Sequence, residues 1–126
     1  MNQHKIKIKI GKIEIQGNLN GCETSIKLLD LLPINAKVNT WGHEIYFPVG
    51  LGKEVEPNSS DIVESGSLAY WPPGDAFCIF YGQTPASQST EIRAASPVTL
   101  LGNVLGDETV FKAISSGEEI TLERSS

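Results

Sequence analysis

The chain has 126 residues, of which 40% are hydrophobic and 20% are charged, and its formal net charge is −5. This length is enough for one domain with a buried core, and the composition excludes a disordered polymer. No apolar run approaches the roughly 18–20 residues that cross a bilayer, so we expect no membrane partner. We predict a single domain over residues 1–126, soluble and cytoplasmic.

The charges are distributed unevenly. Residues 1–12 carry four lysines and no acid, whereas the rest of the chain carries 6 basic and 15 acidic side chains. A mostly acidic surface repels phosphate backbones, which excludes nucleic acid as a general partner. The two cysteines and two histidines lack the spacing of a metal site, and we expect neither a metal nor another cofactor.

The first predicted element is a β-hairpin. Isoleucines alternate with lysines as far as Ile10, and the alternation resumes at Ile13 after a two-residue break at positions 11–12. A turn at that break pairs Ile10 with Ile13 and Ile8 with Ile15, so that the isoleucines share one face. The lysines would then solvate the other face and discourage edge pairing.

The remaining elements are short strands and two helices. Apolar spacing in residues 22–32 predicts one amphipathic helix that ends at Pro33, and a short helix is predicted between Asp107 and Gly117. Segments 52–61 and 83–91 are predicted to be loops, and Pro72-Pro73-Gly74 is predicted to be a tight turn between antiparallel strands. Strand-like segments occupy residues 36–49, 61–71, 76–82, 96–105 and 118–124. This pattern predicts a mainly β fold, a closed antiparallel β-barrel whose open ends are capped by the two helices.

The first candidate site is the segment NTWGHEIYF, residues 39–47. In a strand over residues 43–47, Glu44 and Tyr46 share one face, opposite a mostly apolar face. Two interpretations remain open. The segment is a strand with a polar outer face, or Glu44 and Tyr46 stand at the lip of a cavity as acceptor and donor for a ligand, with Trp41 at the preceding bend.

The second candidate is the aromatic-rich segment of residues 67–87. Trp71 directly precedes the Pro-Pro-Gly turn, where bulky rings are often partly exposed. Phe80 and Tyr81 lie on opposite faces of the following strand, and the core of a small barrel absorbs only one of those faces fully. These rings therefore either pack in the core, which is commonest for aromatics, or line a pocket.

The third candidate is Arg93, one of two arginines in the chain. Its guanidinium would either hold a carboxylate or carbonyl of a ligand or pair with Glu91. The chain contains no glycine-rich phosphate loop, no G-x-S-x-G and no H-E-x-x-H, so no motif demonstrates an enzyme.

The stretches NTWGHEIYFPV, GSLAYWPPGDAFCIFYGQTPAS and EIRAASPVTLLGNV resemble a small prokaryotic cyclophilin-like family of unknown function. With the order of the flanking elements, the resemblance spans nearly the whole chain and implies the capped antiparallel barrel. In true cyclophilins an arginine helps the prolyl amide to twist, but the corresponding stretch, residues 39–47, has none. Ser96-Pro97 stand where these isomerases have a histidine.

Three functions are compatible with these observations. The favoured one is a binding module for a small molecule or short peptide, whose pocket would comprise Trp41, Glu44, Tyr46, Trp71, Phe80, Tyr81 and Arg93. The second is an enzyme, either a prolyl isomerase with a degenerate active site or one that uses Glu44 as a general base. The third, implied by the resemblance, is an interaction subunit of a larger enzyme, with a homodimer or a protein partner.

Overall fold

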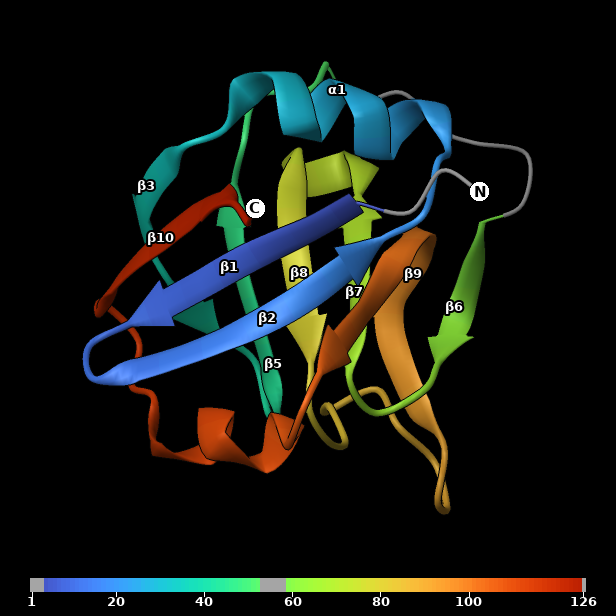
Figure 1. Cartoon of the computed structure of the whole chain (residues 1–126). Coiled ribbons are helices and arrows are strands. Elements are labelled where there is room, and N and C mark those ends of the chain that lie inside the picture. The colour runs from blue at the N-terminus through green and yellow to red at the C-terminus, as the bar shows by residue number, and fades with distance from the viewer. Residues whose placement is uncertain (1–3, 53–58, 126) are drawn as a thin grey trace.

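A computed structural model describes residues 4–52 and 59–125 (Figure 1). Most of the predicted loop at 52–61 lies outside these described residues. The helices are α1 (Glu23–Leu31), η1 (Pro72–Gly74) and η2 (Glu108–Ala113), of which the last two are 3-10 helices. The strands are β1 (His4–Ile10), β2 (Ile13–Leu19), β3 (Ile34–Lys37), β4 (Asn39–Thr40), β5 (Glu44–Pro48), β6 (Ser60–Val63), β7 (Ser67–Trp71), β8 (Ala76–Phe80), β9 (Ile92–Leu105) and β10 (Glu119–Arg124).

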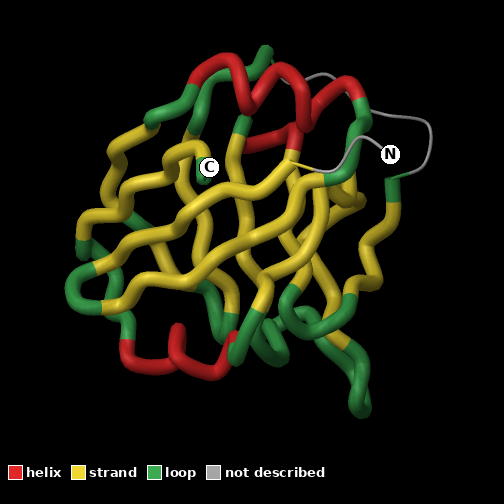
Figure 2. Tube along the Cα trace, in the orientation of Figure 1, coloured by secondary structure: helices red, strands yellow, loops and turns green. Residues whose placement is uncertain are grey.

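The strands form one strongly curled antiparallel sheet. In the described part of the chain their order is β3-β10-β1-β2-β9-β7-β8-β5-β4, and β6 pairs with β9 beside this path. Helix α1 lies across one end of the curled sheet, and η2 lies at the opposite end (Figures 1 and 2). No helix in the described segments is long and apolar enough to cross a membrane.

The prediction of a closed barrel is wrong, because the two edge strands of the sheet do not pair with each other. Strands β3 and β4 end the strand order on either side, and only Val38 separates them in the chain. Antiparallel pairing needs a turn of about two residues, which a single residue does not provide. The Val38 amide instead donates a hydrogen bond to the Glu118 carbonyl, 2.9 Å away. The sheet therefore curls around its core but stays open.

The predicted hairpin is confirmed in its register. Ile10 pairs with Ile13 and Ile8 with Ile15 across β1 and β2, and Gly11 has a positive φ in the turn. The side chains of β1 that face the core are fully buried isoleucines. Lys9 lies on the other face and pairs with Glu123 on β10, with 3.1 Å between nitrogen and oxygen.

Both predicted helices are present, with small differences. Helix α1 buries Leu28 and Leu29, while Ile26 is 41% exposed, so the buried stripe is narrower than the spacing of apolar residues suggests. The second helix is a 3-10 helix that begins after Asp107, whose carboxylate accepts a hydrogen bond from the Thr109 amide at 3.0 Å.

Strand β9 divides the interior into two buried clusters. Its second half lies between β2 and β7, whereas its first half leaves them and pairs with β6. The larger cluster fills the inside of the curled sheet under α1 and η2. The smaller cluster lies on the other face of β7 and β8, beneath β6 and the first half of β9; its buried members are Val63, Ala69, Cys78, Phe80, Ile92, Ala94 and Val98.

Candidate functional site

A cavity of about 250 Å³ opens beside the smaller cluster. Three strands supply most of its wall: β5 with Glu44 and Tyr46, β7 with Trp71, and β9 with small side chains. The described residues that line it are Trp41, Glu44, Tyr46, Trp71, Ala94 and Ala95. The three aromatic rings are partly exposed, so the cavity is reachable from solvent.

A tight turn positions Glu44. The amides of Trp41 and Glu44 each donate to the carbonyl of the other, at 2.9 and 3.2 Å, which closes the hairpin between β4 and β5. Gly42 takes a positive φ in this turn, and a Cβ there would lie 2.8 Å from a ring carbon of Pro85. The turn is therefore packed against the loop after β8, and both ends of the segment Trp41–Glu44 are fixed.

Glu44 is an acid inside an apolar wall. The residue is 6% exposed, and burial raises the pKa of its carboxyl from 4.5 to about 7, although a hydrogen bond from the Cys78 thiol lowers it. Burial and the neighbouring carboxylate raise the pKa of Cys78 well above its ordinary value, so this thiol stays protonated. No Lys or Arg of the described segments forms an ion pair with Glu44.

Trp71 is held on three sides. Its indole N–H donates to the Ser96 hydroxyl at 2.7 Å, and its ring meets Tyr46 edge-on at 6.4 Å between centroids and 74° between planes. The ring also covers Gly74, where a Cβ would lie 2.6 Å from the indole. The Pro-Pro-Gly turn thus provides the space in which this ring lies.

The remaining aromatic residues of the predicted pocket do not line the cavity. Phe80 is fully buried in the smaller cluster that backs the cavity. Tyr81 lies in the larger cluster, where it stacks on His43 at 5.3 Å and meets Phe111 at 6.0 Å. Four of the five rings in the aromatic-rich segment are therefore core residues, and Trp71 is the one that reaches the cavity.

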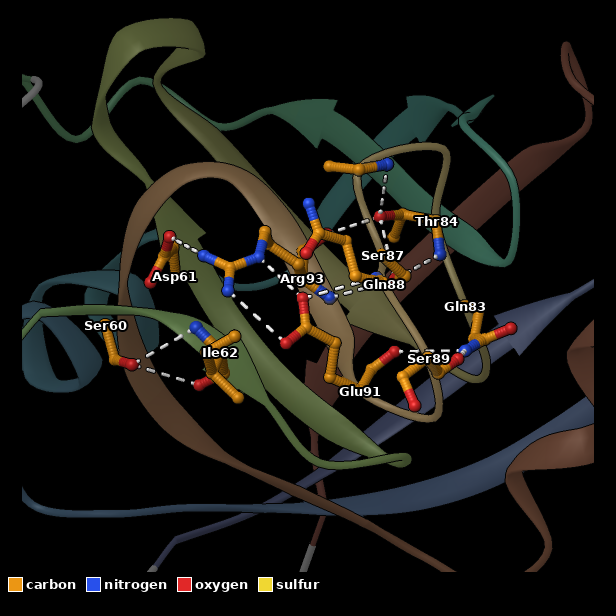
Figure 3. A network of polar contacts seen from close by, with 11 residues as sticks. Ser60, Asp61, Ile62, Gln83, Thr84, Ser87, Gln88, Ser89, Glu91 and Arg93 are labelled. Atoms are coloured by element: carbon orange, nitrogen blue, oxygen red, sulfur yellow. Dashed lines mark hydrogen bonds and ion pairs between the residues drawn. The ribbon is translucent and has the colours of Figure 1, made fainter.

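Arg93 is not among the residues that line the cavity. It belongs to a polar network, drawn in Figure 3. Its Nε–H donates to Glu91 at 2.7 Å, and a second guanidinium nitrogen pairs with Asp61 on β6. Its backbone amide donates to the Ser87 hydroxyl at 3.0 Å. Arg93 thus connects the loop before β9 to β6. Of the two roles considered for its guanidinium, ligand binding and pairing with Glu91, the structure shows the pairing with Glu91.

Sequence reasoning missed four contributors: Ala94 and Ala95, whose small side chains leave the cavity space, Ser96, which orients Trp71, and Cys78, which contacts Glu44. A run of small residues, AAS, directly after Arg93 was the available signal. Its meaning depends on the bend of β9 over β7 and β8, which the sequence pattern does not reveal.

The family model described as "Cyclophilin-like" matches residues 4–123. The chain belongs to the cyclophilin-like family. This cyclophilin-like domain is also similar to a hypothetical protein from Archaeoglobus fulgidus whose solution structure is known, with 37% identity and a TM-score of 0.83. That match covers 98% of this chain and 95% of the other. No curated protein matched the sequence.

Membership of the cyclophilin-like family accounts for the order of helices and strands. The chemistry of the cavity has to be inferred from the residues that line it. Ser96 of this cyclophilin-like domain bonds to Trp71, and Arg93 is engaged by two acids. In residues 4–52 and 59–125, no group of three or more His, Cys, Asp or Glu side chains is arranged to hold a metal ion.

Proposed function

We propose that this cyclophilin-like domain is a binding module that holds a small molecule, or one or two residues of a peptide, in the cavity beside Glu44. The observation that carries the proposal is the cavity itself, whose wall contains three aromatic rings and one buried acid. Apolar walls with a few placed polar groups are typical of ligand sites. The volume of about 250 Å³ lies just below the usual range of roughly 300–1,000 Å³, which favours a small ligand.

The test uses the two tryptophans of the chain, both of which line the cavity. We would record the two indole N–H signals by NMR, and the thermal midpoint, against a panel of metabolites and short proline-containing peptides. A ligand that binds in the cavity should shift both indole signals and raise the midpoint temperature of thermal unfolding. The variant Glu44→Ala should lose the response, and Glu119→Ala, at an exposed position of β10, should keep it. A folded protein in which no panel member shifts either indole contradicts the proposal.

A second candidate function is general acid–base catalysis by Glu44. The observation that favours it is the burial of this carboxyl in the cavity wall, which raises its pKa to about 7 and suits proton transfer near neutral pH. A catalyst must also turn its ligand over. Incubation of the bound ligand with the protein, followed by mass spectrometry, separates the two functions, because a binding module returns the ligand unchanged.

A further inference from the structure

We propose that the cavity binds a methylated ammonium group, with the positive nitrogen held between the rings of Trp41, Tyr46 and Trp71 and the carboxylate of Glu44. The inference rests on the proposed function and names the ligand class for the same cavity. Three features of the cavity support it: the charge of the residues that line it, the arrangement of their aromatic rings, and the small number of side chains that can form hydrogen bonds.

The wall of the cavity has no cationic side chain to hold an anion. Among the described residues that line it, Glu44 is the only acid, and none is Lys, Arg or His. Arg93 lies on β9 next to Ala94, but Asp61 and Glu91 engage its guanidinium. The formal charge of the wall is therefore zero or negative, which disfavours anions and favours a cation.

The aromatic rings provide the second attraction. Tyr46 and Trp71 both line the cavity, with their ring planes at 74° to each other, and Trp41 comes from the turn before β5. Cations bind to aromatic faces through the ring quadrupole, and the attraction grows when the site is desolvated. A cage of several rings is the usual arrangement for quaternary ammonium ligands.

The few polar atoms of the wall favour a methylated nitrogen over a primary amine. An –NH₃⁺ group brings three donors that need acceptors. Glu44 and Tyr46 have side-chain oxygens, whereas Ala94 and Ala95 have no polar side-chain group. The indole N–H of Trp71 is a donor that already bonds to Ser96. Methyl groups on the ligand nitrogen need no acceptor and contact the rings directly.

The size of the cavity is consistent with this head group. A volume of about 250 Å³ corresponds to roughly eight water molecules at their share of liquid volume. That space accommodates a trimethylammonium head and a short polar tail. It does not accommodate an extended peptide, which would have to continue outside the cavity.

A cation should bind only when Glu44 is ionised, so binding should depend on pH. Of the elements around Glu44, β8 brings Cys78, whose raised pKa keeps the thiol neutral, and β5 brings the phenol of Tyr46. Strands β7 and β9 bring Trp71 and two alanines, which do not titrate. His43, next in the chain, stacks on Tyr81 in the other cluster. In the described segments Glu44 is thus the group whose titration controls binding.

The experiment compares three probes by tryptophan fluorescence and indole NMR shifts. Choline has a fixed charge, 3,3-dimethylbutan-1-ol is its uncharged isostere, and ethanolamine is its primary-amine analogue. We expect choline to bind at least about tenfold more tightly than the isostere, because only the cation gains the aromatic and ionic attraction. Ethanolamine should also bind more weakly than choline.

The pH series isolates the role of Glu44, because the charge of choline does not titrate. Its affinity should rise about tenfold per pH unit up to pH about 7 and then level off. Glu44→Gln should remove this dependence and weaken choline binding, and it should leave only the part of the preference over the isostere that the rings supply. The matched variant Glu119→Gln, with its exposed side chain on β10, should behave as the wild type.

The outcomes separate this inference from the proposed function. Equal affinity for choline and its isostere, or an affinity for choline that does not change with pH, overturns the inference while the cavity remains a binding site. The inference is also overturned, and the proposed function kept, if neither compound binds but another panel member shifts the indole signals. If no compound of any class shifts them, the proposed function and the inference fail together. A preference for choline that becomes smaller and independent of pH in Glu44→Gln, but keeps its full size in Glu119→Gln, supports both.

Discussion

At the scale of single residues, the most unusual group is the Glu44 carboxyl, which is buried among aromatic rings without a basic partner among the described residues. Its ionisation is disfavoured because water is replaced by apolar neighbours. The free-energy cost of ionising Glu44 arises only in the folded state, because the carboxyl is solvated in the unfolded chain. A buried acid that lowers the stability of the fold at neutral pH is consistent with a residue kept for ligand binding.

The first prediction concerns stability against pH. The folded-state pKa of Glu44 is about 7 and its ordinary value is 4.5, so between these pH values the unfolded chain has released a proton that the folded chain retains. Stability is therefore lost as pH rises through this window, by about 3 kcal/mol for this group. Relative to wild type, Glu44→Gln should gain that much between pH about 4.5 and about 7. Urea unfolding across this range checks it, and a constant difference would contradict it.

The second prediction concerns the space under Trp71. In Gly74→Ala the new methyl carbon would lie 2.6 Å from the indole, so the ring must move. We expect a loss of about 1–2 kcal/mol in unfolding free energy and several-fold weaker choline binding. Pro73→Ala, in the same turn but exposed, is the control and should preserve the affinity. Unchanged choline binding in Gly74→Ala would show that the indole position does not matter.

Part of this site was predictable from the sequence. The two-residue period of a strand places Glu44 and Tyr46 on one face, and the Pro-Pro-Gly turn marks Trp71 as partly exposed; the cavity brings all three together. Phe80 and Tyr81 could not be assigned in this way, because both faces of β8 are covered, each by a different cluster. Such coverage depends on how distant strands fold over β8.

At the scale of elements, β2 and β9 approach each other closely at Gly102. A Cβ on Gly102 would lie 1.7 Å from the Asn18 carbonyl oxygen, a backbone atom held in the sheet. The side chain of any other residue would separate these strands. Local sequence patterning does not identify such a position, because the contact joins residues far apart in the chain.

The third prediction compares two glycines of this strand pair. Gly102→Ala should lower the unfolding free energy by about 3 kcal/mol or more, since the collision is with backbone. Gly17→Ala should cost less, because the nearest atom to its new Cβ is the end of the flexible Leu68 side chain, at 2.9 Å. Chemical denaturation measures both. A Gly102→Ala protein as stable as Gly17→Ala would mean that the strands are not packed as described.

The fourth prediction concerns the element that Arg93 anchors. Because its guanidinium bonds Glu91 and Asp61 outside the cavity, Arg93→Ala should loosen the loop at 83–91 and leave choline affinity unchanged. Amide hydrogen exchange should be faster in this loop and in β6. A large loss of affinity without faster exchange would instead place Arg93 in contact with the ligand.

At the scale of the whole molecule, the sequence predicted the class of fold but not its closure. Alternation, turn residues and capping residues define the hairpin and both helices, because these depend on neighbours in the chain. Closure depends on whether the last strands meet, and here β3 and β4 are joined through Val38 without pairing. The sequence also contains no local signal for the bend in the long strand β9, because each half of it has the pattern of an ordinary strand.

The same bend gives the molecule its second buried cluster and hence its cavity. The larger cluster fills the inside of the curled sheet. The smaller cluster packs against Tyr46 and Trp71 and lies next to the cavity that Glu44 lines. Structural stability and ligand contact are thus assigned to opposite faces of β7 and β8.

The most direct test is an NMR titration of the Glu44 carboxyl carbon, assigned by comparison with Glu44→Gln. We expect a pKa of about 7 in the free protein, and a lower pKa with choline bound. A carboxyl that titrates near 4.5 in the free protein would mean that Glu44 is solvated and that the cavity does not enclose it.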